Sequence, residues 1–208
     1  MTDILFVRPA DDSAAITAGT WGSALLQKVP VACSSTDLSG SSNTDRQSID
    51  RELKSGIRNL FWFGHGTDTE LVSNGAAIID AANLRRLQSG IVVAIACHAG
   101  RSLGPATLNV KSVKAFLGFD DEVLIPLVFP LPMGNAVVQG LSCLFEDNHE
   151  IQCAADKLRL RFEDAVQDYK TNGQAYGMTP DETRTAWLFA KSNQYSVTLH
   201  GDLSAKIS

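Results

Sequence analysis

A histidine and a cysteine stand in matching positions after two apolar segments of the chain. His65 follows residues 60–63 and a single glycine, and Cys97 follows residues 91–96 directly. A thiol attacks as its thiolate, and an imidazole is a suitable base near neutral pH. Both segments are apolar at every position, which is typical of central strands in a parallel sheet. Such strands end at one edge of the sheet, so His65 and Cys97 are expected to meet there as acid/base and nucleophile.

The glycine after the histidine suits the same chemistry. The backbone N–H of Gly66, which no side chain obstructs, can join that of Cys97 as an oxyanion hole. Residues 67–90 are predicted to contain one helix, enough for a single right-handed crossover between neighbouring strands. The ends of such strands would lie roughly 5 Å apart.

The ordered set of motifs resembles the caspase-like (clan CD) cysteine peptidases, and most closely the bacterial CHAT-domain proteases. The histidine motif is Phe63-Gly64-His65-Gly66, and the nucleophile motif is Ala94-Ile95-Ala96-Cys97-His98-Ala99-Gly100. Residues 113–120 resemble the next strand of that family, and Leu199-His200-Gly201-Asp202 resembles its carboxyl-terminal strand.

This resemblance implies a three-layer α/β/α sandwich around a mostly parallel sheet, with residues 1–208 as a single peptidase domain. It implies an endopeptidase that needs no cofactor or metal, with His65 as acid/base and Cys97 as nucleophile. One departure is Ile95, which stands two residues before the nucleophile, where caspases carry a polar pocket residue.

Two charged residues are candidates for substrate binding. Asp120 follows the strand at 113–119, and an acidic pocket there would select Arg or Lys. The alternative is that Asp120 is a cap or turn residue. Arg8, at the end of the first strand, would instead favour acidic substrate residues.

Two other functions stay open. An amidotransferase-like α/β hydrolase would use Cys97 with His200 and Asp202, although its nucleophile elbow requires a small residue where Ile95 stands. A catalytically silent interaction module could use the same fold, because a fold does not fix a function.

Composition limits the remaining possibilities. The chain has 208 residues, 44% of them hydrophobic, which suits one compact domain. Its 18 Lys and Arg against 23 Asp and Glu form no dense basic run, so we expect no nucleic-acid partner. We find no signal peptide and no apolar run of the roughly 18 to 20 residues that span a bilayer, and therefore expect a cytoplasmic protein without a membrane partner. The expected partners are a protein or peptide substrate and, left open, an activating partner or regulator.

The other cysteines are interpreted as structural. Cys33, Cys143 and Cys153 form no CxxC pair or zinc-ligand spacing with one another or with Cys97, which predicts a reducing compartment. Because of its histidine partner, Cys97 is expected to be the thiol most readily alkylated near neutral pH.

The elements that must position these residues alternate between strand and helix, which predicts an α/β fold. We expect a flexible loop at 34–43, an N-terminal cap at Thr44 and Gln47, an N-cap at Asp80, and a helix end at Gly90. The predicted strands are 4–7, 29–33, 60–63, 91–96, 113–119 and 195–199. The predicted helices are 13–26, 45–55, 80–88, 133–144, 151–169 and one that begins at Thr179-Pro180.

Overall fold

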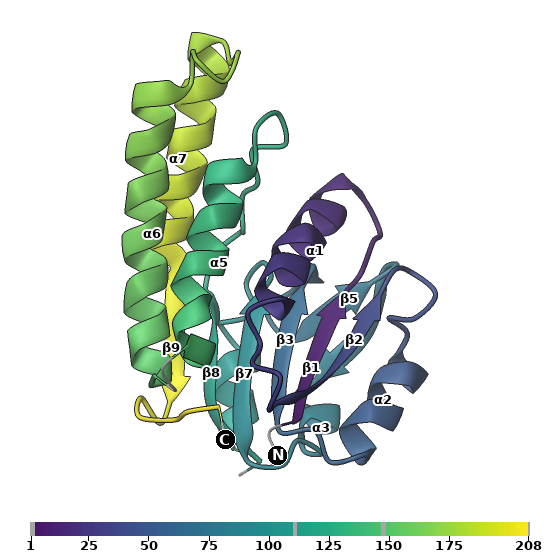
Figure 1. The fold of residues 1–208 in the computed structure, drawn as a ribbon. Helices are drawn as coiled ribbons and strands as arrows, with labels where there is room; N and C mark the ends of the chain where they lie inside the picture. The colour runs from purple at the N-terminus through teal and green to yellow at the C-terminus, as the bar shows by residue number, and fades with distance from the viewer. Residues whose placement is uncertain (1–2, 110–111, 147–148, 208) are drawn as a thin grey trace.

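The computed structural model describes residues 3–109, 112–146 and 149–207, which build a six-stranded sheet with helices on both faces (Figure 1). The strands lie in the order β2-β1-β3-β7-β8-β9, and only β9 runs antiparallel to its neighbour. Their bounds are β1 (Asp3–Arg8), β2 (Ser34–Ser39), β3 (Asn59–Phe63), β7 (Gly90–Ile95), β8 (Val113–Phe119) and β9 (Val197–Gly201).

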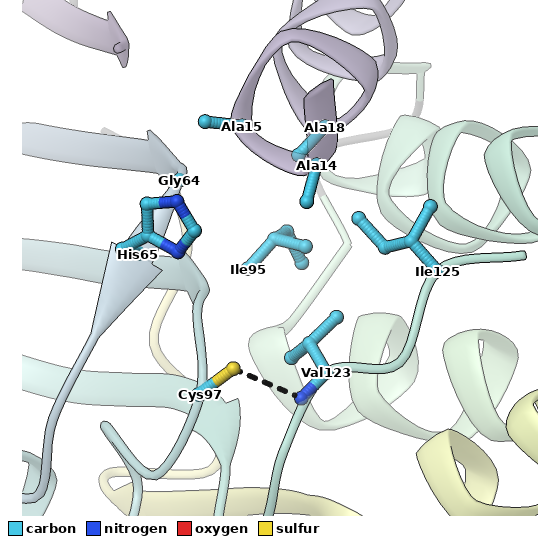
Figure 2. Close-up of a pocket in the computed structure, with 9 residues that line it drawn as sticks. All are labelled: Ala14, Ala15, Ala18, Gly64, His65, Ile95, Cys97, Val123 and Ile125. Carbon is cyan, nitrogen blue, oxygen red and sulfur yellow. Dashed lines mark hydrogen bonds between the residues drawn. The ribbon is translucent and has the colours of Figure 1, made fainter. Parts of the chain in front are cut away.

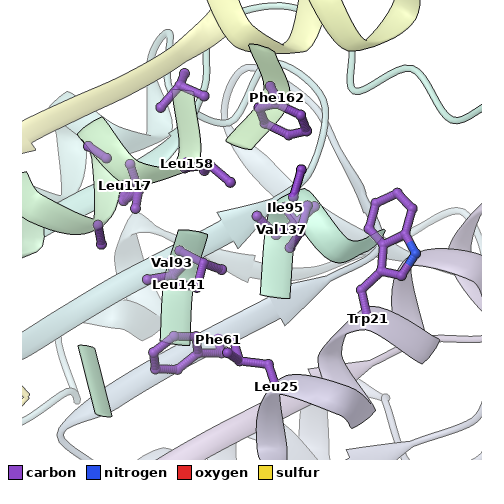
Figure 3. Close-up of a cluster of buried hydrophobic side chains, with 14 of the residues drawn as sticks. Trp21, Leu25, Phe61, Val93, Ile95, Leu117, Val137, Leu141, Leu158 and Phe162 are labelled. Atoms are coloured by element: carbon purple, nitrogen blue, oxygen red, sulfur yellow. The ribbon is translucent and has the colours of Figure 1, made fainter. Parts of the chain in front are cut away.

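One face of the sheet is covered by α1 (Ser13–Leu26), α5 (Leu131–Glu146), α6 (Ile151–Asn172) and α7 (Pro180–Ser196). Alternate strand residues supply this face, because successive side chains of a strand point to opposite sides. They include Phe61, Val93, Ile95 and Leu117, which pack against Trp21, Leu25, Val137, Leu141, Leu158 and Phe162 of the helices (Figure 3).

The other face carries a second apolar cluster. It is covered by α2 (Arg46–Lys54), α3 (Ala81–Leu84) and α4 (Leu103–Leu108), which pack on Leu60, Trp62, Val92, Ala94 and Phe116. Two layers of helices thus enclose a mostly parallel sheet, which confirms the predicted three-layer α/β/α class. It also explains why β3 and β7 are apolar at every position.

A small antiparallel sheet begins at the histidine and continues into the segment where only a helix was expected. It consists of β4 (His65–Gly66), β5 (Glu70–Ser73) and β6 (Ala76–Asp80). Asn74 and Gly75 join β5 to β6 with φ angles of 50° and 73°, the left-handed conformation that a tight hairpin turn requires. The Asn-Gly pair was the sequence signal for this hairpin.

Several element boundaries differ from the sequence predictions. Residues 29–33 were predicted to be a strand but are not one. The strand is β2, which lies inside the segment predicted to be a loop. Its sequence is polar because β2 lies at the edge of the sheet, where only its Leu38 is buried. Asp45, not Thr44, caps α2 by accepting a hydrogen bond from the Ser48 N–H.

The helix that Asp80 caps ends at Leu84 rather than at residue 88. Gly90 is not a helix cap. It belongs to β7, where a Cβ would overlap the Arg58 carbonyl oxygen at 1.7 Å. The helix at 13–26, the strand at 113–119 and the capping box at Thr179 and Glu182 are confirmed.

Among the described residues, no helix is both long and apolar enough to cross a bilayer. The same part of the chain holds no group of three or more His, Cys, Asp or Glu side chains that could hold a metal ion.

Candidate active site

The pairing of β3 with β7 brings the histidine and the cysteine to the same level of the sheet. These strands are parallel neighbours in which Phe63 pairs with Ile95. His65 lies two residues beyond Phe63, and Cys97 lies two residues beyond Ile95. Both side chains line one pocket at the carboxyl edge of the sheet, as the sequence predicted (Figure 2).

This pocket has a volume of about 100 Å³ and lies between α1 and the segment after β8. Figure 2 shows His65 and Cys97 on one side of it, with side chains of α1 and those of Val123 and Ile125 on the others. The lining residues are Ala14, Ala15, Ala18, Gly64, His65, Ile95, Cys97, Val123 and Ile125.

The thiol of Cys97 is held protonated in this environment. Burial raises its pKa, and the negative charges of Glu122 and Asp121 raise it further. The Val123 N–H, which donates to Cys97 Sγ at 3.3 Å, opposes these effects without overcoming them. The expectation that Cys97 is the most readily alkylated thiol near neutral pH is therefore revised: the resting side chain is a neutral thiol.

A first prediction follows from this pKa. Alkylation of Cys97 by iodoacetamide should be slow near pH 7 and should accelerate by about tenfold per pH unit toward pH 9, because only the thiolate reacts. Glu122→Gln should accelerate the reaction at neutral pH by no more than about fivefold, since exposed charges interact weakly. Mass spectrometry of the labelled peptide measures both rates. A rate that is already constant below pH 7 would contradict the raised pKa.

A carboxylate that the sequence analysis missed contacts the histidine. Asp12 Oδ2 lies 3.0 Å from His65 Nε2, while Asp12 Oδ1 accepts the Ala15 N–H at 2.9 Å and caps α1. The Ala15 N–H and the nearby His65 ring lower the pKa of Asp12, so it is a carboxylate at neutral pH. The available signal was an aspartate just before a predicted helix and just after the first strand, at the same sheet edge.

Gly66 packs directly on the backbone of the cysteine. A Cβ at this position would lie 2.8 Å from the Cys97 carbonyl oxygen and 2.9 Å from the Ala96 Cβ, so only glycine fits without movement. The indole N–H of Trp62 donates to the His65 carbonyl at 3.0 Å and holds the backbone of the same two residues in place. The oxyanion hole at Gly66 and Cys97 stays a prediction.

Neither charged candidate for substrate binding lines the pocket. Arg8 forms an ion pair with Asp37 at 2.5 Å and donates to the Gly19 carbonyl at 3.1 Å, so it joins β2 and α1. Asp120 is exposed, and its backbone N–H donates to the Ser196 carbonyl at 2.9 Å.

The alternative triad is not assembled in the structure. His200 pairs with Phe116 within β8, and its Nε2 lies 2.8 Å from the Gly100 carbonyl oxygen. The Asp202 N–H donates to the Lys114 carbonyl near the amino end of β8, whereas Cys97 follows the carboxyl end of the parallel strand β7. Asp202 and Cys97 therefore lie toward opposite edges of the sheet.

Comparison with known proteins gives matches in structure only. No family model matches the chain, and no curated protein matches it in sequence. The Arg-specific cysteine proteinase gingipain R matches with a TM-score of 0.64 and 12% identity over 99% of this chain and 47% of the other. A structure described as a protease matches with a TM-score of 0.66 and 12% identity over 99% of this chain and 48% of the other. The complex of the pro- and mature domains of RgpB from Porphyromonas gingivalis matches with a TM-score of 0.63 and 13% identity over 99% of this chain and 48% of the other.

These matches establish the fold. The chain has the caspase-like α/β arrangement of gingipain R, with a mostly parallel central sheet and flanking helices. It spans about half the length of each of these solved chains.

Proposed function

We propose that this chain is a caspase-like cysteine endopeptidase that hydrolyses peptide bonds in a protein or peptide substrate. The observation that carries the proposal is the shared pocket of His65 and Cys97 at the carboxyl edge of the sheet. The fold, which is that of cysteine proteinases, supports it. The motif resemblance to CHAT-domain proteases and a reducing cytoplasmic location belong to the proposal as well, and an activating partner or regulator stays open.

In the acylation step, His65 takes the proton of the Cys97 thiol as Sγ bonds to the substrate carbonyl carbon. The carbonyl oxygen becomes an oxyanion, which the N–H groups of Gly66 and Cys97 would receive. When the carbon–nitrogen bond breaks, the protonated histidine gives its proton to the leaving amine. The products are a free amine and a thioester on Cys97.

In the deacylation step, His65 takes a proton from water as the water oxygen attacks the thioester carbon. Collapse of the second oxyanion breaks the carbon–sulfur bond, and the proton returns to Sγ. The acid product leaves, and the enzyme regains a neutral thiol and a neutral histidine. Since the pKa of Cys97 is raised at rest, proton transfer to His65 accompanies the attack and does not precede it.

Asp12 is the positioning residue for this histidine. Its carboxylate accepts from His65 Nε2, which directs the remaining ring nitrogen, Nδ1, to the reaction. The negative charge also stabilises the imidazolium that forms while the proton is held. Asp12 is itself fixed by its role as the cap of α1.

The substitution Asp12→Asn separates these two roles. Asparagine caps helices as well as aspartate does, so the melting temperature of the variant should equal that of the unmodified protein. The kcat should fall by roughly ten- to a hundredfold, less than for a buried aspartate in this role, because Asp12 is half exposed. Steady-state kinetics and thermal unfolding measure the two effects. Asp12→Ala should lose stability in addition. Unchanged kcat in Asp12→Asn would remove Asp12 from the mechanism.

Cleavage of an internally quenched peptide library tests the proposed function. We expect cleavage at internal bonds that is lost after alkylation of the protein at about pH 9 and that persists in the presence of a chelator. Loss of cleavage with the chelator but not with the thiol reagent would contradict the proposal.

A further inference from the structure

The pocket beside the candidate nucleophile is apolar, and this bears on the substrate. Three alanines of α1 form one wall of it, and Ile95, Val123 and Ile125 form the others. Figure 2 shows Ala14, Ile95, Val123 and Ile125 arranged around the same space. Among the described residues that line the pocket, only His65 and Cys97 have ionisable side chains.

The lining of this pocket, as far as the structure describes it, contains no carboxylate, guanidinium or ammonium group that could pair with a charged substrate side chain. The carboxylate of Asp120 is exposed and outside the lining, and the guanidinium of Arg8 is already paired with Asp37. A charge that enters an apolar pocket loses its hydration and requires a compensating charge or hydrogen bonds. Apart from His65 and Cys97, which act in the proposed reaction, this described lining offers such a group neither an acidic nor a basic counterpart.

The pocket has room for a substrate side chain. Its volume of about 100 Å³ is several times the roughly 10 to 15 Å³ of accessible space that one water molecule needs. An aliphatic side chain such as that of valine or leucine can therefore enter it.

The position of the pocket identifies which substrate residue would enter it. Cys97 lines the pocket, and the residue that supplies the attacked carbonyl becomes bonded to Sγ. Its side chain begins only two bonds from that carbonyl carbon. This side chain is therefore the one that must enter a space bordered by the sulfur.

We infer that the enzyme cleaves after aliphatic residues, such as valine or leucine, and that Ala14, Ile95, Val123 and Ile125 determine this specificity. The inference rests on the proposed function. It replaces both the acidic pocket at Asp120 and the basic pocket at Arg8.

A series of peptidyl acyloxymethyl ketones tests the inference without requiring turnover. In this reaction Sγ bonds to the ketone methylene carbon, the carbon–oxygen bond of the leaving group breaks, a carboxylate departs, and the thiol proton passes through His65 to solvent. The residue next to the ketone is varied among Gly, Val, Leu, Lys, Arg and Asp. We expect Cys97 to be labelled at least tenfold faster by the Val and Leu probes than by the charged ones.

Substitutions on one helix supply matched controls. Ala14→Leu fills the pocket and should slow the Leu probe by roughly 10- to 200-fold relative to the Gly probe, the range for added methylenes in an apolar pocket. Ala24→Leu makes the same change at an exposed position of α1 outside the pocket and should leave that ratio unchanged. Ala14→Asp, in the first turn where acidic residues stabilise a helix, should raise the Lys rate relative to the Leu rate.

Two outcomes overturn different statements. Faster labelling of Cys97 by the Lys, Arg or Asp probe, or equal rates for all side chains, would overturn the inferred specificity while leaving the peptidase proposal in place. Failure of every probe to label Cys97, with labelling of other thiols instead, would overturn the proposed function and the inference with it. Circular dichroism of each variant establishes that it is folded.

Discussion

The substitution Cys97→Ala should lower kcat/KM for peptide hydrolysis by at least roughly 10⁴-fold, the largest effect that we expect from any single change. Removing the nucleophile leaves only substrate binding and oxyanion stabilisation, and in hydrolases of this kind the nucleophile carries most of the rate enhancement. The methyl group of alanine fits wherever the Cβ of Cys97 lies. The variant should therefore fold and still bind substrate.

Cys33→Ala is the matched control for this change. Cys33 is also a partly buried free thiol, but it lies outside the pocket. We expect this variant to keep the activity of the unmodified protein. Steady-state kinetics on the preferred peptide decides between the two residues. Full activity of Cys97→Ala, or equal losses in both variants, would contradict the role of Cys97.

The substitution His65→Ala should lower kcat by roughly 10² to 10⁴-fold, the usual contribution of a positioned acid/base. The loss should be severe because the raised pKa of Cys97 leaves the thiol dependent on a base for its deprotonation. The defect should diminish as the pH rises, since hydroxide then removes the proton that His65 would have taken. Rates measured from about pH 7 to pH 9 follow this recovery.

His200→Gln is the control for the second histidine. The glutamine can still donate to the Gly100 carbonyl, which lies 2.8 Å from His200 Nε2, so this contact can be kept. We expect near-normal kcat. A large loss of kcat in His200→Gln together with normal activity of His65→Ala would move the acid/base role to His200.

The strands that position the dyad could be predicted because their signals are local. Residues 60–63 and 91–96 are apolar at every position, which only a strand covered on both faces requires. Parallel neighbours then place the residues that follow them at one edge. The α/β/α class is confirmed for this reason, and His65 and Cys97 line one pocket.

The remaining site residues depend on contacts between distant parts of the chain. Asp12 and His65 are 53 residues apart in the sequence, and the local sequence around either residue does not predict their contact. Ala14 and Ala18 line the pocket only because α1 packs beside the segment after β8, and an alanine in a helix carries no functional signal by itself. The substrate role assigned to Asp120 relied on its place after a strand, which does not tell where the following loop directs the side chain.

Capture of the acyl-enzyme tests the central claim most directly. A peptide nitrophenyl ester with leucine at the reacting carbonyl acylates faster than a peptide amide, so the thioester should accumulate and survive an acid quench. Intact mass and peptide mapping should show one acyl group per chain, on Cys97, formed much more slowly in His65→Ala and absent in Cys97→Ala. Acylation of a different residue, or ester hydrolysis that continues in Cys97→Ala, would contradict the account.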